Sequence, residues 1–189
     1  MRIVAGKHRG RRLVAPEGLA VRPTADRTRE ALFNILSQGH KGLPPLDGAR
    51  VLDAFAGTGA LGLEALSRGA ESVSFIESQP AAIATLERNI RALEEEEATE
   101  VIRADALRPP RTSYPANIVL MDPPYSQGLA EPAITALAKA GWIGEASLIV
   151  VELMAKEPFT PPDGFEIRDQ RKYGKARLVF LEPTGSEGD

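Results

Sequence analysis

The stretch that decides the fold reads Val51-Leu52-Asp53-Ala54-Phe55-Ala56-Gly57-Thr58-Gly59-Ala60-Leu61-Gly62. An apolar run leads into a glycine-rich turn, and helix-forming residues follow the turn. Glycine tolerates positive φ and lets a ligand approach the backbone, while the N-terminus of a following helix attracts carboxylates and phosphates. The stretch therefore predicts a strand, a ligand-binding loop and a helix of an α/β fold.

Two cofactors remain open for this loop. Gly57, Gly59 and Gly62 match the G-x-G-x-x-G pattern, and Glu77 lies about twenty residues on, where a ribose-binding acid belongs. Both NAD and S-adenosylmethionine present an adenosine ribose to such an acid. Asp53 favours S-adenosylmethionine, because its charge would repel a pyrophosphate but attract the ammonium and sulfonium groups.

The residues on either side of this stretch alternate between strand and helix patterns. Strands are expected at residues 50–54, 72–76, 100–103, 116–121, 146–152, 165–172 and 176–181, and helices at 60–67, 81–93 and 129–140. Such alternation predicts a doubly wound, mostly parallel, seven-stranded sheet of the α/β class with both faces covered. Only Tyr173-Gly174-Lys175 separates the last two strands, which predicts an antiparallel C-terminal hairpin.

A second motif, Asp122-Pro123-Pro124-Tyr125, follows the apolar run 118–121. Ligands of open α/β sheets bind beyond the carboxyl ends of the strands, where this loop is expected. Asp122 and the Pro123 carbonyl can accept the hydrogens of an exocyclic base amine, and Tyr125 can stack on the base. The motif therefore predicts methylation of a base amino group, the alternative being a proline-stiffened turn with a capping acid.

A weaker signal follows the strand expected at residues 100–103. Asp105 can accept a hydrogen bond from an adenine amine, with Ala106 against the ring. An aspartate after a strand is equally typical of a turn.

Positive charge is concentrated at the start of the chain. Residues 1–30 contain eight basic and three acidic residues, whereas the remainder contains 15 basic and 23 acidic ones, for a net charge of −3. Such a segment can neutralise nucleic-acid phosphates, although it could also be only a solvated tail. The candidate RNA-binding residues are Arg2, Lys7, Arg9, Arg11, Arg12, Arg22, Arg27 and Arg29.

The same segment has a predicted structure. Residues 2–5 and 12–15 are typical of a small β-hairpin, and Thr24 is expected to cap a helix with one apolar face. Residues 39–48, rich in glycine and proline, are expected to be a linker. We therefore expect an N-terminal hairpin-and-helix extension at residues 1–40 and a catalytic domain at residues 41–189.

The composition argues against several other classes. With no cysteine among 189 residues, disulfides, thiolate-bound metals and methylation through a cysteine nucleophile are excluded. His8 and His40 are expected at the surface, so no metal site is expected. No secretory or membrane-spanning run is found, which favours a cytoplasmic protein. The acidic run at residues 94–97 is expected to extend a helix end into solvent.

The whole pattern resembles the bacterial small-subunit ribosomal RNA (guanine-N2) methyltransferase D family. The residues that carry the resemblance are Arg2-Ile3-Val4-Ala5-Gly6, Arg9-Gly10-Arg11-Arg12-Leu13, Arg22-Pro23-Thr24, Arg29-Glu30-Ala31-Leu32-Phe33-Asn34, the glycine loop, Asp122-Pro123-Pro124-Tyr125 and Tyr173-Gly174. The Asp-Pro-Pro-Tyr motif alone is shared with adenine-N6 methyltransferases, and the N-terminal block makes the match specific.

This resemblance implies a class I methyltransferase fold and a role for each motif. Phe55, Ala56, Gly57, Thr58 and Gly59 would hold the methionine part of S-adenosylmethionine, Glu77 its ribose, and Asp105 with Ala106 its adenine. The Asp122–Tyr125 loop would hold a flipped guanine of 16S rRNA in an assembled or assembling small subunit, and the protein would act as a monomer. An adenine-N6 methyltransferase, an NAD-dependent oxidoreductase and a non-catalytic RNA-binding module remain the alternatives.

Overall fold

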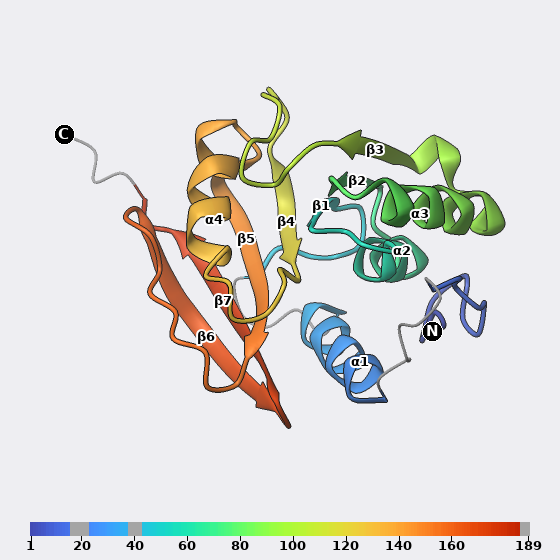
Figure 1. Ribbon diagram of the computed structural model, residues 1–189, viewed down its shortest axis with the longest axis horizontal. Coiled ribbons are helices and arrows are strands. Elements are labelled where there is room, and N and C mark those ends of the chain that lie inside the picture. The colour runs from blue at the N-terminus through green and yellow to red at the C-terminus, as the bar shows by residue number, and fades with distance from the viewer. Residues whose placement is uncertain (16–22, 38–42, 186–189) are drawn as a thin grey trace.

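Seven strands form one sheet at the centre of the protein, in the order β3-β2-β1-β4-β5-β7-β6 (Figure 1). The computed structural model describes residues 1–15, 23–37 and 43–185, without the side chains of residues 23–26. The strands are β1 (Arg50–Ala54), β2 (Ser72–Glu77), β3 (Thr99–Arg103), β4 (Ala116–Met121), β5 (Ile143–Met154), β6 (Phe165–Tyr173) and β7 (Ala176–Pro183).

Strand directions confirm the predicted doubly wound sheet with its C-terminal hairpin. β1 pairs in parallel with β2 and β4, β2 with β3, and β4 with β5. β7 lies antiparallel between β5 and β6. Strands buried on both faces need apolar side chains in both directions, which explains the continuous apolar runs of β4 and β5.

Helices cover both faces of the sheet. Helices α1 (Pro23–Ser37), α2 (Ala60–Ser67) and α3 (Pro80–Leu93) pack over one core cluster, which contains Phe33, Leu63 and Leu86. Helix α4 (Ala130–Lys139) packs over a second cluster that contains Ile134 and Leu137. Figure 1 shows that β4 and β5 both point toward α1, so α1 lies beside the carboxyl ends of these central strands.

The first fifteen residues, here called the N-terminal arm, fold back on themselves. Arg2 and Arg12 form one isolated antiparallel bridge, and the Ile3 amide donates to the Arg11 carbonyl at 3.0 Å. The expected hairpin is therefore present as a turn with a single bridge rather than as two strands. The expected boundary between residues 40 and 41, and residues 39–42 of the expected linker, lie outside the described residues.

The acidic run after α3 differs from its prediction. The helix ends at Leu93, and Glu94 takes a left-handed φ of 59°. The chain then turns inward, so that Glu95 is only 6% exposed, before the 3-10 turn η1 (Glu96–Ala98). Glu94, Glu96 and Glu97 are exposed to solvent, as predicted. The prediction is wrong for the helix, which does not extend into this run, and for Glu95, which is held by two basic side chains of the N-terminal arm.

Candidate active site and its basic arm

The glycine-rich loop joins β1 to α2 and is tightly constrained. Gly59 precedes α2 with a φ of 81°, and a Cβ there would lie 2.3 Å from a methyl group of Leu86. Phe55 also takes a positive φ, 63°, which is strained for a residue with a side chain. A Cβ at Gly57 would meet only the Phe55 carbonyl, at 4.0 Å, so the backbone at Gly57 is open to a ligand.

Asp53 lies in β1 beneath this loop and is 1% exposed. Its carboxylate accepts a hydrogen bond from the Gly62 amide at 2.8 Å, at the start of α2. Burial raises the pKa of Asp53 well above its ordinary value; the Gly62 hydrogen bond opposes this shift, while Asp122 and Glu77 add to it. Asp53 therefore fixes the loop to the helix and contributes to an acidic environment.

Glu77 ends β2 and joins two loops. Its carboxylate accepts hydrogen bonds from the Gly57, Ser78 and Gln79 amides, each at 2.8 Å. It thus reaches the glycine loop from the next strand, as a ribose-binding acid would. Asp105 lies beyond β3, exposed, and its carboxylate accepts from the Leu107 amide at 2.9 Å.

Four acidic side chains share one face of the sheet near the strand ends. They are Asp53 of β1, Glu77 of β2, Asp122 after β4 and Glu152 of β5. Side chains alternate along a strand, and the residues two positions before these acids pack in the cluster beneath α1, α2 and α3: Val51, Phe75, Leu120 and Val150. All four carboxylates therefore point toward the face that α1 covers.

The Asp122–Tyr125 loop begins beside the glycine loop. Ala54 and Met121, the last residues of β1 and β4, pair in register, so the two loops leave the sheet side by side. The Tyr125 hydroxyl donates to Glu152 Oε1 at 2.8 Å, and the Ser126 amide donates to Glu157 Oε1 at 3.0 Å. Acids of β5 and of the turn after it therefore hold the loop.

Glu152 was not among the residues singled out from the sequence. One signal was present, since it is an acid inside the apolar run 148–153, and charged residues are rarely buried without a partner or a function. Its partner lies on another strand, so the sequence pattern gave no reason to connect Glu152 with Tyr125.

Asp122 and Glu152 perturb each other. Crowding by the surrounding protein, followed by the nearby Glu152 carboxylate, raises the pKa of Asp122 from 3.8 to about 7, although its side chain stays open to solvent on one side. Burial also raises the pKa of Glu152, while the Tyr125 hydrogen bond and the charge of Arg29 oppose that shift. Asp122 is thus suited to accept a hydrogen bond or a proton near neutral pH, with a second carboxylate beside it.

Buried polar groups attach the N-terminal arm to the body. The Glu64 carboxylate accepts from the Val4 amide at 2.7 Å and the Ala5 amide at 3.0 Å, and also from Arg68 Nε at 2.7 Å. Asn89 bonds both backbone groups of Val14 and the Thr58 carbonyl. The arm is therefore a docked part of the structure that also touches the glycine loop.

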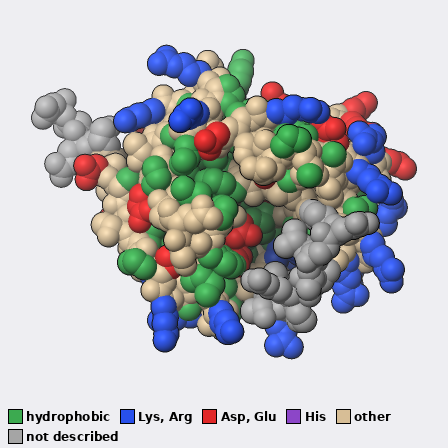
Figure 2. All heavy atoms as spheres, in the orientation of Figure 1, with side chains coloured by type: hydrophobic (Ala, Val, Ile, Leu, Met, Phe, Trp, Pro, Cys, Tyr) green, Lys and Arg blue, Asp and Glu red, His purple; other side chains and the backbone are tan. Residues whose placement is uncertain are grey.

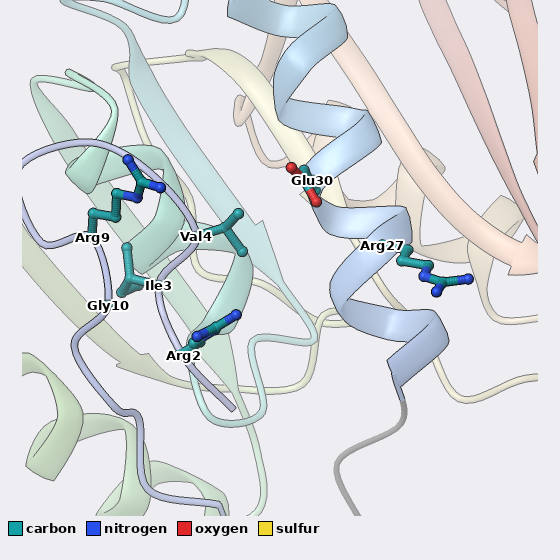
Figure 3. Close-up of a pocket in the computed structure, with 7 residues that line it drawn as sticks. All are labelled: Arg2, Ile3, Val4, Arg9, Gly10, Arg27 and Glu30. Atoms are coloured by element: carbon teal, nitrogen blue, oxygen red, sulfur yellow. The ribbon is translucent and has the colours of Figure 1, made fainter.

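Most of the candidate RNA-binding residues lie on the surface. The exposed members are Arg2, Lys7, Arg9, Arg11, Arg12 and Arg27, and Arg22 lies outside the described residues. Figure 2 shows Lys and Arg side chains around most of the edge of this face, with acidic side chains nearer its middle and at the upper right. The arm and α1 enclose a hollow of about 400 Å³ lined by Arg2, Ile3, Val4, Arg9, Gly10, Arg27 and Glu30 (Figure 3).

Three of the candidate RNA-binding residues, and His8 beside them, have partners among the described residues. Arg29 is 4% exposed and donates to the Arg2 carbonyl at 2.8 Å. It therefore lies in the interior, where its charge acts on Glu152, and its contact with RNA stays a prediction. Lys7 Nζ lies 2.6 Å and His8 Nε2 2.5 Å from Glu95 Oε1. Arg11 donates to the Ala92 carbonyl. His8 is thus half-buried and partnered rather than a plain surface residue, while His40 lies outside the described residues.

The sheet order and the loops at its carboxyl edge are those of class I S-adenosylmethionine-dependent methyltransferases. At the level of fold alone, the chain matches magnesium protoporphyrin IX methyltransferase from Synechocystis, solved with that cofactor, with a TM-score of 0.63 at 14% identity over 85% of this chain and 80% of that one. A structure from Escherichia coli described as a methyltransferase candidate matches with a TM-score of 0.79 at 35% identity, covering 97% of both chains.

Sequence comparison gives the family. A family model described as Conserved hypothetical protein 95 matches residues 1–182. Ribosomal RNA small subunit methyltransferase D of Escherichia coli K12 is 42% identical over 98% of this chain and 92% of its own length. The protein of that name from Haemophilus influenzae is 36% identical over 92% and 89%. The chain belongs to the ribosomal RNA small subunit methyltransferase D family.

S-adenosylmethionine is the cofactor of this class, and the residues present fit it. The sulfonium and ammonium groups of this cofactor are positive, and the ends of β1 and β2 present the neighbouring carboxyl groups of Asp53 and Glu77. The open backbone at Gly57 leaves room beside the loop.

Among the described residues, no group of acids and histidines is arranged to hold a metal ion. No helix in this part of the chain is long and apolar enough to cross a membrane.

Proposed function

We propose that this protein methylates the N2 amine of a guanine in small-subunit ribosomal RNA, with S-adenosylmethionine as the donor. One observation carries the proposal: the glycine loop and the Asp122–Tyr125 loop leave paired positions of neighbouring strands. A donor in the first loop and a base in the second would therefore lie adjacent. The names of the relatives support ribosomal RNA as the substrate. We further propose that the protein acts in the cytoplasm as a monomer, on an assembled or assembling subunit.

We assign the cofactor to the loops at the ends of β1, β2 and β3. Glu77 would bind its ribose, Asp105 and Ala106 its adenine, and Asp53 would orient the loop through Gly62. The residues that would hold its methionine part are Phe55, Ala56, Gly57, Thr58 and Gly59. When bound, it supplies an electrophilic methyl group.

The Asp122–Tyr125 loop would prepare the amine. The lone pair of an exocyclic amine is delocalised into the ring, so the amine is a poor nucleophile. Asp122 and the Pro123 carbonyl would accept its hydrogens, and Asp122, with a pKa of about 7, would take the proton that the amine loses. Pro124 stiffens the loop, and Tyr125, 36% exposed, would stack on the base. Orientation of this kind can supply ~7–11 kcal/mol in well-positioned systems.

The N-terminal arm and α1 would bind the RNA backbone. We retain residues 1–40 as the proposed RNA-binding extension and residues 41–189 as the proposed catalytic domain. Replacing Arg9, Arg11 and Arg12 by alanine should flatten the salt dependence of RNA binding by up to ~0.9 per lost phosphate contact. An unaltered slope would show that these exposed side chains make no phosphate contacts.

The direct test is tritiated methyl transfer to naked 16S RNA, assembled small subunits and DNA, followed by nucleoside analysis. The expected product is N2-methylguanosine from an RNA-containing substrate. N6-methyladenosine would replace the proposal with the adenine-N6 alternative, because both amines fit the same acceptors. Absence of labelled product from all three substrates would contradict methylation of nucleic acid.

A further inference from the structure

Two carboxylates lie at the ends of β4 and β5. The proposed reaction uses only one of them, Asp122, as an acceptor for the amine, and this leaves the second without a role. Met121 and Val151 pair in parallel register, so Asp122 and Glu152 occupy equivalent positions on neighbouring strands. Because side chains alternate along a strand, both acids point to the same face of the sheet. Both also lie near Tyr125: Asp122 is three positions before it in the sequence, and Glu152 accepts its hydrogen bond. The second acid therefore belongs to the place where the base would lie.

The two carboxylates present hydrogen-bond acceptors. Tyr125 donates to Glu152 Oε1, and Glu152 Oε2 receives no hydrogen bond from the described residues. An ionised carboxylate is acceptor-only. Two such groups side by side complement a base edge that offers two adjacent donors and oppose an edge that offers a donor beside an acceptor.

Guanine and adenine differ in this respect. Beside its exocyclic amine guanine carries N1–H, a second donor, whereas adenine carries an unprotonated N1, which is an acceptor. A flipped base is read by hydrogen bonds to this Watson–Crick edge. Resting on the proposed function, we infer that Glu152 is a specificity-determining residue that accepts the N1–H of the target guanine while Asp122 accepts from N2.

Burial raises the pKa of Glu152, and two neighbouring groups offset part of that rise. The charge of buried Arg29 and the Tyr125 hydroxyl both favour the ionised form of Glu152 and so oppose the effect of burial on its pKa. A protonated Glu152 would offer a donor, which would suit adenine N1 instead. Arg29 on α1, held to the Arg2 carbonyl, thus favours the acceptor form that selects guanine.

The test compares guanine with 2-aminopurine, which keeps the 2-amine but has an acceptor at N1. A small-subunit RNA is prepared with either base at the mapped methylation position, and kcat/KM is measured for the wild type and Glu152→Gln. Glutamine can still accept from Tyr125 and can donate to an acceptor at N1. The wild type should prefer guanine by ~10–100-fold, in the range of a good base contact, and Glu152→Gln should remove most of that preference.

Glu157→Gln is the matched control, because Glu157 holds the same loop through the Ser126 amide but has no assigned base contact. It should keep the wild-type ratio between the two bases. If Glu152→Gln kept the wild-type ratio of kcat/KM between guanine and 2-aminopurine, the inference would be overturned. Equal use of both bases by the wild-type protein would also overturn it. A wild type that makes no N2-methylguanosine would instead refute the proposed function.

Discussion

Two pairs of acidic residues in this protein differ in the groups that surround their carboxylates. Glu64 and Glu95 lie beneath the N-terminal arm, where amides and basic side chains surround them. Asp122 and Glu152 lie at the ends of β4 and β5, where each has the other as a neighbour. The protein itself supplies the partners of the first pair. In the second pair, the described residues give Glu152 one hydrogen bond, from Tyr125, and give Asp122 none.

The pKa directions follow this difference. Burial raises the pKa of Glu95, but hydrogen bonds from Lys7 and His8 outweigh it, so the pKa falls below its ordinary value. The pKa of Asp122 rises to about 7. An acid with internal cationic partners stabilises the fold, whereas acids crowded together are typical of functional sites.

The largest effect on stability is expected from Glu64→Ala. Removing this fully buried carboxylate deprives two arm amides and the Arg68 guanidinium of their acceptor. The free energy of unfolding should fall by ~3–5 kcal/mol, as when one partner of a buried pair is lost. Urea denaturation measures it, with exposed Glu97→Ala as the control, expected within ~0.5 kcal/mol of wild type. Equal losses in both variants would show that the buried contacts of Glu64 add nothing to stability beyond those of an exposed acid.

Asp122→Ala should act on catalysis instead. Transfer should fall by ~10²–10³-fold, the usual cost of losing one positioned hydrogen-bonding group in an active site. Binding of S-adenosylmethionine, measured by calorimetry, should be largely retained, because the proposed cofactor contacts lie on other loops. Loss of binding together with transfer would mean that Asp122 supports the structure, as Glu64 does.

Gly6→Ala should test how closely the arm is docked. A Cβ at Gly6 would lie 1.7 Å from the Ser67 carbonyl oxygen, whereas one at Gly10, with a similar φ of +85°, meets nothing within 4 Å. Gly10→Ala should cost ~1–2 kcal/mol for the left-handed backbone, and Gly6→Ala ~1–3 kcal/mol more for overpacking. Thermal unfolding compares them; equal costs would indicate that the arm does not rest on α2 at this point.

The smallest expected effects are on the pH dependence of stability. Asp122 and Glu95, one acid from each pair, should change stability in opposite directions as pH rises. Because its folded pKa is raised from 3.8 to about 7, Asp122 should lower stability as pH rises through that window. Glu95, with its pKa lowered from 4.5, should add stability above 4.5 that is lost as pH falls through its folded pKa. Melting temperatures of Asp122→Asn and Glu95→Gln against wild type measure this. Parallel pH profiles for both variants would contradict the opposite assignments.

Prediction from the sequence succeeded where the pattern is local. The bounds of β1, α2 and β4 agree with those predicted at 50–54, 60–67 and 116–121, since a strand, a glycine turn and a helix each have their own residue pattern. Prediction from the sequence failed for Glu95, because this residue is one of four consecutive glutamates and nothing in the local sequence distinguishes it from its exposed neighbours. Only its contacts with Lys7 and His8, more than eighty positions earlier, distinguish it.

The sequence by itself determined the alternating strands and helices, the glycine loop and the acid-proline-proline loop, because each depends on neighbouring residues. Only the tertiary structure decided which carboxylates meet and which are paired. Glu152 reaches Tyr125 across 27 positions, and Glu64 reaches Val4 across 60. Such contacts depend on strand order, register and helix docking, and a local pattern of residue types does not specify these.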